Sequence, residues 1–488
     1  MKKLANSQTN FKLGLMSPVL QSRRKRVAGS PSPQRSVVSL TRSASIQKST
    51  RPAKIIELLV DPPQPKKLNF YDSWKLSNNL SLHTKVFIVQ GHHPDLRQAL
   101  LARGWVENKD PSSSFFDFIW VRTGKHPITI QDWQIVNHFP NNFEISAKWN
   151  FCENVKNLYL HSINPDTFFP KCFRITSKDI HAFEDSFRLI KAINILKNFT
   201  ETGQGLPEKV FTALGVCKRW AGMLERRERP KVFSTVCHSE WRILNSSSNT
   251  ESQFEFKKFF AGKPTNFQDL SVKVSDFLSK LQNLDPQFHL YGTKNIWIVK
   301  PGRKSRGREI SLFDNLESIK KYTQNPQKWV VQKYIENPLL IERKKFDIRQ
   351  WVLVSSGHPL TIWVFSKCYL RFAVDSYDNN SLNNLFMHLT NNSISKNSKK
   401  FDNESSMWSS DRFIEYLKEE YSEDLWSSKI LPGMKNIIKW SLMAVGPLGR
   451  KKSFELLGYD FMIDQNMNVW LIEVNSSPTM EYSTVRNK

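Results

Sequence analysis

Cysteine is scarce in this 488-residue sequence, and none of its five copies belongs to a C-x-x-C pair. We therefore expect reduced thiols in an intracellular protein, with neither a disulfide framework nor a cysteine zinc site. The five positions are Cys152, Cys172, Cys217, Cys237 and Cys368. Long apolar runs are absent too, since no stretch reaches the roughly 18 residues of a membrane-spanning helix. We expect a soluble chain.

Acidic residues are missing from the first 56 positions, which hold twelve Lys or Arg and many Ser. This composition buries too little apolar surface to fold, so we predict a disordered basic tail over residues 1–66. An organelle transit peptide is the alternative, but a convincing amphipathic helix is lacking. The whole chain has 71 Lys and Arg against 45 Asp and Glu, a net charge of +26. Nucleic acid, acidic protein tails and anionic membranes are all candidate partners for a chain with this net positive charge.

The hydrophobic pattern divides the rest of the chain into three parts, and no internal repeat is visible. Residues 67–177 read as a small α/β lobe, 178–285 as a helical segment with a polar loop, and 286–488 as a strand-rich core. Helices are expected at 91–105, 183–199, 207–224, 410–421 and 434–445. Strands are expected at 85–90, 115–122, 294–300, 328–335, 346–354 and 360–373. The predicted fold class is α+β.

Two apolar runs near the carboxyl end, 458–464 and 469–475, flank a polar turn and predict a β-hairpin. Alternation places Leu471, Glu473 and Asn475 on one face of the second strand. A four-residue turn would place Asp460 opposite Glu473.

The oxygen atoms of Asp460, Glu473 and Asn475 suit Mg²⁺, which fills its remaining positions with water and nucleotide phosphates. An exposed polar edge is the alternative. Two acids and an amide among apolar neighbours are, however, costly to bury without a cation. We therefore predict a magnesium site that binds the metal together with ATP.

The segment 300–308, KPGRKSRGR, packs five cations, two glycines and a serine into nine residues directly after a predicted strand. Glycines let backbone amides approach an anion, and the cations neutralise phosphate charge. The Walker A pattern is absent, and a solvated basic turn is the alternative. Together with the carboxylate hairpin, the segment favours a nucleotide.

Lys345, Asp347 and Arg349 alternate along one predicted strand and point to one side, whereas Phe346 and Ile348 point into the core. Such a strand can form the wall of a site for a metal and phosphates, or a solvent face with compensating charges. The cluster at 388–392, HLTNN, is rich in small hydrogen-bonding groups and indicates a loop or a helix cap.

Six phrases, in order, resemble the tubulin tyrosine ligase-like family, whose fold is an ATP-grasp. They are KPGRKSRGREI (300–310), VVQKYIENPLLI (330–341), KFDIRQWVLV (345–354), YLRF (369–372), HLTNNSI (388–394), and ELLGYDFMID with WLIEVNSSPTM (455–464, 470–480). QGHHPDLRQALLARGW (90–105), FFP (168–170) and KKSFELLGYDF (451–461) are most similar to its tubulin glycine ligases, the monoglycylases. The resemblance implies a family domain over roughly 85–488, with an ATP-grasp catalytic core at 286–488.

Carried over by position, the resemblance implies a role for each matching residue. ATP would be bound by Lys300, Arg306, Gly307, Gln332, Lys333, Tyr334, Ile335, Lys345 and Asp347. The catalytic residues facing the reacting groups would be Arg349, Arg371, Thr390 and Asn391. Mg²⁺ would be held by Asp460, Glu473 and Asn475.

The activity implied by the resemblance is that of an ATP-dependent carbon-nitrogen ligase. It would join free glycine to glutamate side chains in the acidic C-terminal tails of tubulin through an acyl phosphate. The implied protein is a monomer of the cytoplasm, the cytoskeleton and the ciliary axoneme, and its positive charge suits the tubulin tails. Nucleic acid is disfavoured because no reading motif accompanies the charge.

Two alternatives remain open within the resemblance: a tubulin glutamate ligase of the same fold, and an inactive relative that binds microtubules. The second is motivated by Glu309, which stands where the family usually has the last glycine of R-G-x-G. It is also motivated by the end of the chain, eight residues after Met480, where relatives typically continue with a helical segment. The pattern does not distinguish initiation from elongation, or α- from β-tubulin.

Overall fold

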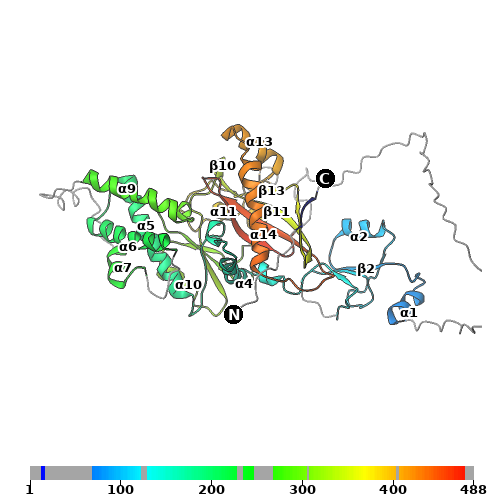
Figure 1. Ribbon diagram of the computed structural model, residues 1–488. Helices are drawn as coiled ribbons and strands as arrows, with labels where there is room; N and C mark the ends of the chain where they lie inside the picture. The colour runs from blue at the N-terminus through cyan, green and yellow to red at the C-terminus, as the bar shows by residue number, and fades with distance from the viewer. Residues whose placement is uncertain are drawn as a thin grey trace, which may run out of the picture.

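The computed structural model describes residues 69–122, 129–227, 235–246, 267–304, 307–402 and 406–478, together with the backbone of 12–16. Figure 1 shows a helical bundle at one end of the molecule, a large sheet in the middle and a small lobe at the other end. None of the described helices is long and apolar enough to cross a bilayer. The α+β fold class expected from the sequence is confirmed.

The small lobe is a four-stranded parallel sheet in the order β3-β2-β4-β5. Its elements are α1 (Phe70–Ser77), β2 (Val86–Val89), α2 (Pro94–Leu101), β3 (Val106–Glu107), β4 (Phe118–Trp120) and β5 (Ile135–Val136). All four residues of β2 are buried, as in a parallel strand covered on both faces. The predicted helix at 91–105 is shorter, because Pro94 starts it and Gly104 follows it with a positive φ of 77°.

A short helical stretch leads from this lobe into the next part of the chain. It consists of α3 (Phe143–Ser146), α4 (Lys148–Asn154), η1 (Val155–His161) and η2 (Pro165–Thr167). The larger helices that follow are α5 (Ile180–Thr202), α6 (Pro207–Glu225), α7 (His238–Leu244) and α9 (Phe267–Leu284), with η3 (Phe288–Leu290) after them. The helices predicted at 183–199 and 207–224 are thus confirmed.

These helices pack on a four-stranded antiparallel sheet in the order β6-β9-β7-β8. The sheet and its helix are β6 (Cys172–Arg174), β7 (Trp297–Pro301), β8 (Ser311–Phe313), α10 (Leu316–Tyr322) and β9 (Trp329–Lys333). On β7, Trp297 and Val299 enter the helical core, so Ile298 and Lys300 face the other way. The domain boundaries drawn from the sequence stay predictions.

The large sheet has eight strands and is organised by one long strand, β11 (Lys344–Gly357). Its other strands are β1 (Lys12–Met16), β10 (Leu340–Ile341), β12 (Leu360–Phe365), β13 (Tyr369–Phe372), β14 (Met407–Ser409), β15 (Glu455–Ile463) and β16 (Val469–Asn475). One edge of β11 pairs with β13 and then β12, and the other pairs with β15. The single strand predicted at 360–373 is therefore wrong, because two strands share this edge of β11.

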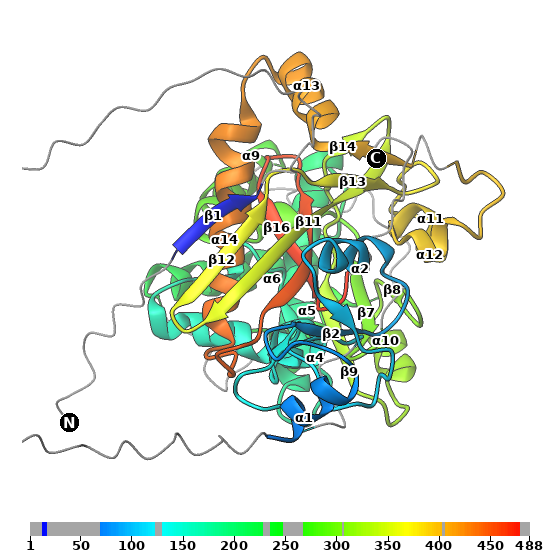
Figure 2. The same cartoon turned by 90° about the vertical axis from the view of Figure 1, so that its right-hand side faces the viewer.

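Strand β1 was not predicted from the sequence. It lies within the predicted tail and extends the edge of the sheet by pairing in parallel with β12 (Figure 2). The rest of the predicted tail, residues 1–66, lies outside the described residues.

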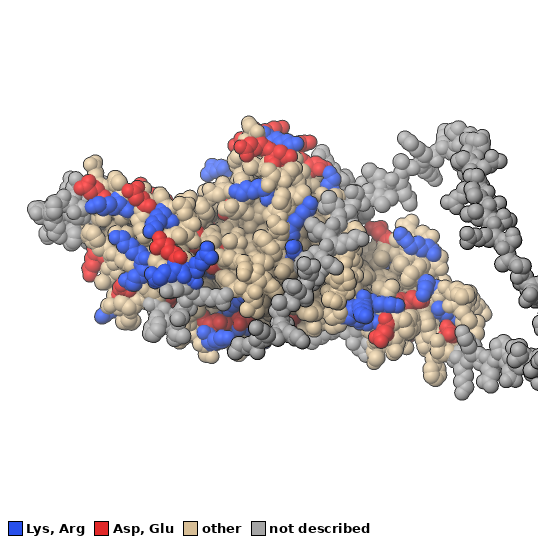
Figure 3. Space-filling view, in the orientation of Figure 1, with Lys and Arg blue, Asp and Glu red and all other residues tan. Residues whose placement is uncertain are grey.

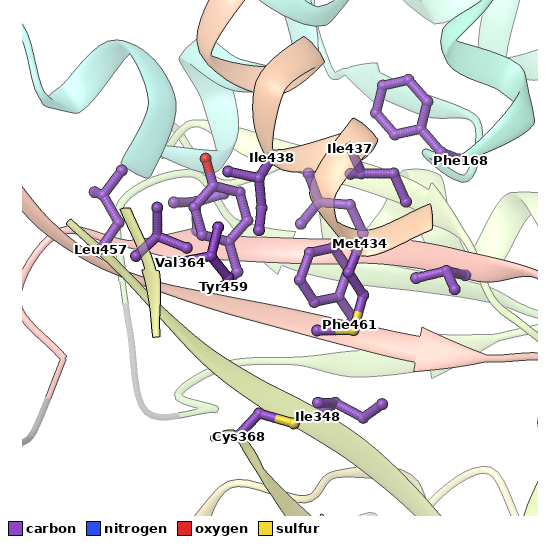
Figure 4. Close-up of a cluster of buried hydrophobic side chains, with 14 of the residues drawn as sticks. Phe168, Ile348, Val364, Cys368, Met434, Ile437, Ile438, Leu457, Tyr459 and Phe461 are labelled. Carbon is purple, nitrogen blue, oxygen red and sulfur yellow. The ribbon is translucent and has the colours of Figure 1, made fainter. Parts of the chain in front are cut away.

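Helices cover one face of the large sheet and complete its core. They are α13 (Ser410–Tyr421), η4 (Trp426–Ile430) and α14 (Leu431–Ala444), and of these α14 lies directly on the sheet. The short helices α11 (Leu385–His388) and α12 (Asn392–Ser395) pack instead against β7 and β8 of the antiparallel sheet. Figure 4 shows Met434, Ile437 and Ile438 of α14 against Tyr459 and Phe461 of β15. Because Tyr459 and Phe461 point into this core, Asp460 between them points to the opposite face of β15.

The predicted hairpin is formed by β15 and β16, and Asp460 lies opposite Glu473. The expected four-residue turn is wrong, because Ile463 pairs with Val469 and five residues lie between them. A β-bulge follows, because Phe461 pairs with Leu471 and leaves Ile472 as an extra residue. Leu471 consequently turns into the core at 0% exposure, while Ile472 and Glu473 both face a cavity. The prediction that Leu471 and Glu473 share a face is wrong, because the bulge shifts the alternation.

A buried polar cluster joins the small lobe to the large sheet. Glu455, the first residue of β15, accepts hydrogen bonds from His138 Nδ1 at 2.6 Å, the Phe139 amide at 2.8 Å and Asn142 Nδ2 at 3.0 Å. Only 1% of Glu455 is exposed. One carboxylate therefore satisfies three donors that the lobe brings to the sheet.

We predict that Glu455→Ala lowers the free energy of unfolding by about 3 kcal/mol, because three buried donors lose their acceptor. Urea denaturation followed by tryptophan fluorescence measures the change. The control is Glu419→Ala on the exposed surface of α13, which should stay within about 0.5 kcal/mol of the parent. Equal losses in the two variants would contradict the role assigned to Glu455.

Candidate active site

One cavity brings together most of the residues selected from the sequence. It lies between β7 and β9 of the antiparallel sheet and β11, β15 and β16 of the large sheet. Twelve predicted residues line it: Lys300, Gly307, Gln332, Lys333, Tyr334, Ile335, Lys345, Asp347, Thr390, Asn391, Asp460 and Glu473. Arg349, Arg371 and Asn475 lie behind this lining, and Arg306 lies outside the described residues.

Two buried lysines face the cavity from different sheets. Lys300 Nζ donates to Gln332 Oε1 at 2.7 Å, and Lys345 Nζ donates to the Tyr334 hydroxyl at 2.8 Å and to the His388 carbonyl at 3.1 Å. Burial lowers the pKa of Lys300 to about 8 and that of Lys345 to about 7, and in Lys345 the charge of Lys300 adds to the effect. Among the described residues, neither lysine has a carboxylate within ion-pair distance, so an incoming anion would stabilise both charges.

Lys333, by contrast, is neutralised within the protein. Its Nζ donates to Glu336 Oε1 at 2.6 Å and to the Ile296 carbonyl at 2.7 Å, and both side chains are fully buried. Its neighbours Tyr334 and Ile335 extend the wall of the cavity. The side chain of Lys333 thus serves the structure of this segment, which the resemblance implies to be a hinge against adenine.

Lys148 is a site residue that sequence analysis missed. It begins α4, and its Nζ lies 2.9 Å from Glu473 Oε2 and 3.3 Å from the carbonyl of Lys304 in the basic segment. Burial would raise the pKa of Glu473, but Lys148 and Lys300 hold it well below its usual range. No local pattern marks Lys148, because its partner is more than 300 positions away in the sequence.

Two arginines behind the cavity wall form a compact cluster with two aspartates that line it. Arg349 contacts Asp460 at 2.5 and 3.1 Å, and Arg371 contacts Asp347 at 2.7 and 2.6 Å. Arg371 also reaches Asp460 at 3.0 Å, and the hydroxyl of Thr390 donates to Asp347 at 2.6 Å. Both guanidinium groups are thus bound by carboxylates and hold these carboxylates at the cavity.

The three residues predicted to bind a metal converge. Asn475 Nδ2 lies 3.2 Å from Asp460 Oδ2 and 3.3 Å from Glu473 Oε1, so one amide group touches both carboxylates. Rotating that amide would present its oxygen instead, completing a set of hard oxygen ligands that suits Mg²⁺. No group of three or more His, Cys, Asp and Glu side chains arranged for a metal occurs in the described parts of the chain. The ligand roles of these residues stay a prediction.

Gly307, near the end of the basic segment, has a backbone conformation that favours glycine, and a side chain there would displace Ile394. Its φ is +69°, and a Cβ there would lie 2.2 Å from Cδ1 of Ile394 and 3.5 Å from Oδ1 of Asn391. The close approach brings the segment against the cluster at 388–392, which forms the connection between α11 and α12. Residues 389–391 form the connection, His388 ends α11 and Asn391 is the N-cap residue of α12, in agreement with the predicted loop or helix cap.

Glu309 points away from the cavity. Its carboxylate pairs with Lys304 and accepts a hydrogen bond from Gln327 Nε2 at 2.8 Å, and 44% of the side chain is exposed. The residue has a φ of +55°, which explains why a glycine is expected at this position. The acid therefore lies outside the lining of the site.

Part of the cavity wall is apolar, which sequence analysis did not anticipate. Pro170, Ile298, Ile310, Leu389, Met462 and Ile472 line it. They come from six separate elements and loops, so no single sequence window contains their pattern. The cavity thus combines an apolar wall with buried cations and convergent carboxylates, the requirements of a nucleotide site.

Comparison with known proteins agrees with this arrangement. Residues 231–488, slightly more than half of the chain, match the tubulin-tyrosine ligase family. Tubulin glycylase 3C of Tetrahymena thermophila is 34% identical over 481 residues, covering 84% of this chain and 45% of the relative. Protein monoglycylase TTLL8 of Mus musculus is 31% identical, covering 85% and 61%. Tubulin monoglycylase TTLL3 of Danio rerio is 31% identical, covering 82% and 64%.

The chain spans between about half and two thirds of the length of these curated relatives. The match to the family includes the basic segment, β9, β11 and the carboxylate hairpin, all of which meet at the cavity. The chain belongs to the tubulin-tyrosine ligase family.

Proposed function

We propose that the chain is an ATP-dependent ligase that joins glycine to glutamate side chains in the C-terminal tails of tubulin. The observation that carries this proposal is the convergence of Asp460, Glu473 and Asn475 opposite the buried Lys300 and Lys345 across one cavity. The relatives described as tubulin glycylase and monoglycylase support glycine as the donor and tubulin as the acceptor.

ATP would bind along the whole cavity. Its base suits the apolar wall and the segment at Tyr334 and Ile335, whereas its phosphates suit Lys300, Lys345 and the basic segment ending at Gly307. Arg306 belongs to this phosphate set by position in the family motif. When bound at Asp460, Glu473 and Asn475, Mg²⁺ would supply positive charge to the phosphates.

The buried cations then have a defined role in the chemistry. A glutamate carboxylate of tubulin attacks the γ-phosphorus, ADP leaves, and an acyl phosphate forms. The amine of glycine attacks the acyl carbon, phosphate leaves, and an isopeptide bond remains. Lys300 and Lys345 stabilise the negative charge on the transferring oxygens, and burial makes that interaction stronger than it would be in water.

Lys148 balances Glu473 before nucleotide binds. Its ammonium lies between the carboxylate of Glu473 and the basic segment, within 3.3 Å of both. Moving this charge toward a phosphate would free Glu473 for a metal without leaving either group unpaired. We assign Lys148 to the phosphate set on this ground.

Arg349, Arg371, Thr390 and Asn391 are assigned to the junction between nucleotide and amino acid. The cluster with Asp347 and Asp460 fixes both guanidinium groups, and Thr390 and Asn391 line the cavity beside it. Fixed donors at this place would orient a carboxylate substrate without reorganising during the reaction.

Glutamate-tail recognition is consistent with the surface charge. Figure 3 shows Lys and Arg side chains gathered over the helical end of the molecule, beside the large sheet. With a net charge of +26, the chain would attract acidic tails in a salt-sensitive way. We extend the proposal to a monomer that acts on the cytoskeleton and on axonemal microtubules of cilia.

One argument for the alternative of an inactive microtubule-binding relative no longer holds, because Glu309 lies outside the cavity lining. A glutamate ligase of the same fold remains the competing candidate. The donor has to be decided by experiment, since the same cavity would bind ATP in both enzymes.

We predict that the chain transfers labelled glycine to tubulin in the presence of ATP and Mg²⁺, and that Glu473→Gln lowers the rate at least about 100-fold. The substitution removes one negative charge from the proposed metal site while keeping the side-chain shape. The matched control is Glu419→Gln on α13, which should retain the parent rate.

The same assay separates the candidates. Labelled glutamate offered at equal concentration should be incorporated poorly, and preferential glutamate transfer would identify a glutamate ligase instead. Microtubule binding without any nucleotide binding would contradict both ligase assignments.

We predict that ATP affinity falls as the pH rises from 7 to 9, and that ATP binding takes up protons in this range. The pKa of Lys345 is about 7 and that of Lys300 about 8, so the free protein loses these charges as the pH rises, whereas ATP favours the charged forms. Above its pKa, each group contributes up to about tenfold per pH unit.

Titration calorimetry at pH 8 in buffers of different ionisation enthalpy measures the proton uptake. Lys345→Met should take up fewer protons than the parent, and Lys418→Met on the exposed surface of α13 should match the parent. Binding enthalpies that do not depend on the buffer would refute the coupling.

A further inference from the structure

Two cysteines lie next to each other beside the candidate active site. Cys152 is on α4 and is fully buried at 0% exposure, whereas Cys172 starts β6 and is partly exposed. The thiol of Cys172 is a direct electrostatic neighbour of Cys152, and α4 packs directly on β6. Neither is part of a disulfide.

Each cysteine is one contact away from a lysine of the site. Lys148 and Cys152 are four residues apart on α4, so they share a face of that helix. Cys172 is paired with Gln332 between β6 and β9, and Gln332 accepts the hydrogen bond of Lys300. A change in the distance between the two sulfur atoms would therefore act on both lysines.

The two thiols differ in access. Cys172 lines a small cavity together with Lys148, Lys300 and Glu473, so a small oxidant can reach it. Burial raises the pKa of Cys152 well above its ordinary value, and the neighbouring Cys172 adds to this effect. Because Cys152 is fully buried and Cys172 lines this cavity, Cys172 should react first.

We propose that Cys152 and Cys172 are an oxidation site, and that a disulfide between them weakens ATP binding. The oxidant is a hydroperoxide. The thiolate of Cys172 attacks a peroxide oxygen, the O–O bond breaks, and the departing oxygen takes a proton and leaves as water or an alcohol. The sulfur of Cys152 then attacks the sulfenic acid of Cys172, the S–S bond forms, and hydroxide leaves with the proton of Cys152 as water.

The disulfide would act by shortening the distance between the sulfur atoms of Cys152 and Cys172. Bonded sulfur atoms lie about 2.05 Å apart, much closer than thiols in contact, so α4 and β6 must move toward each other. This movement displaces Lys148 from Glu473 and alters the support that Gln332 gives to Lys300. The effect on ATP rests on the proposed function, whereas formation of the disulfide does not.

The test compares the reduced protein with protein treated with hydrogen peroxide. Peptide mass spectrometry should identify a disulfide between Cys152 and Cys172. The Kd for ATP should rise about tenfold and return to its starting value with dithiothreitol. In Cys172→Ser no disulfide should form and peroxide should leave ATP affinity unchanged. In Cys152→Ser the sulfenic acid should persist at Cys172, where dimedone traps it.

The control is Cys237→Ser, which replaces an exposed cysteine away from the site and should respond to peroxide like the parent. Absence of the disulfide peptide in the treated parent would overturn the proposal, as would a disulfide that leaves ATP affinity unchanged. Failure of the reduced protein to bind ATP would instead refute the proposed function, because mass spectrometry alone decides whether the disulfide forms.

Discussion

The structure depends on pairing charges that are buried between two sheets. Asp347, Asp460 and Glu473 all lie at one cavity, and a carboxylate there without a partner would be very costly to desolvate. Arginines of the large sheet bind the first two, and Lys148 of α4 binds the third. The site thus forms only when elements from different parts of the chain assemble. A further buried carboxylate, that of Glu455, binds residues next to the small lobe and lies on the same strand as Asp460.

Local periodicity was sufficient to predict part of this site from the sequence, and the family resemblance supplied the other residues. The alternation of Lys345 and Asp347 with core residues holds in β11, and Asp460 does lie opposite Glu473. The bulge at Ile472 could not be predicted, because it satisfies the packing of Leu471 in the core and no residue type in the strand requires it. Local rules therefore predict which residues meet, whereas tertiary packing decides their orientation.

Contacts between residues that are distant in the sequence could not be predicted either, because they too depend on tertiary packing. Lys148 looks like any lysine at the start of a short helix, and only the folded chain brings it to Glu473. The division of 360–373 into β12 and β13 depends on β11 offering one edge to two strands. Strand β1 depends in turn on the free edge of β12. In each case the deciding interaction is a pairing with another element.

The charges around the cavity indicate what it is built to receive. Lys304 and Lys333 are neutralised by Glu309 and Glu336, which leaves Lys148, Lys300, Lys345, Arg349 and Arg371 against the three carboxylates of Asp347, Asp460 and Glu473 among the described residues. The positive excess is two charges, about the charge that a nucleoside triphosphate retains when Mg²⁺ is bound to it. Without such a ligand the excess is unfavourable in a buried site, and burial lowers the pKa values of Lys300 and Lys345 accordingly. The lowered pKa values of these lysines and the proposed binding of a metal-bound triphosphate thus both follow from cations that are buried at one cavity.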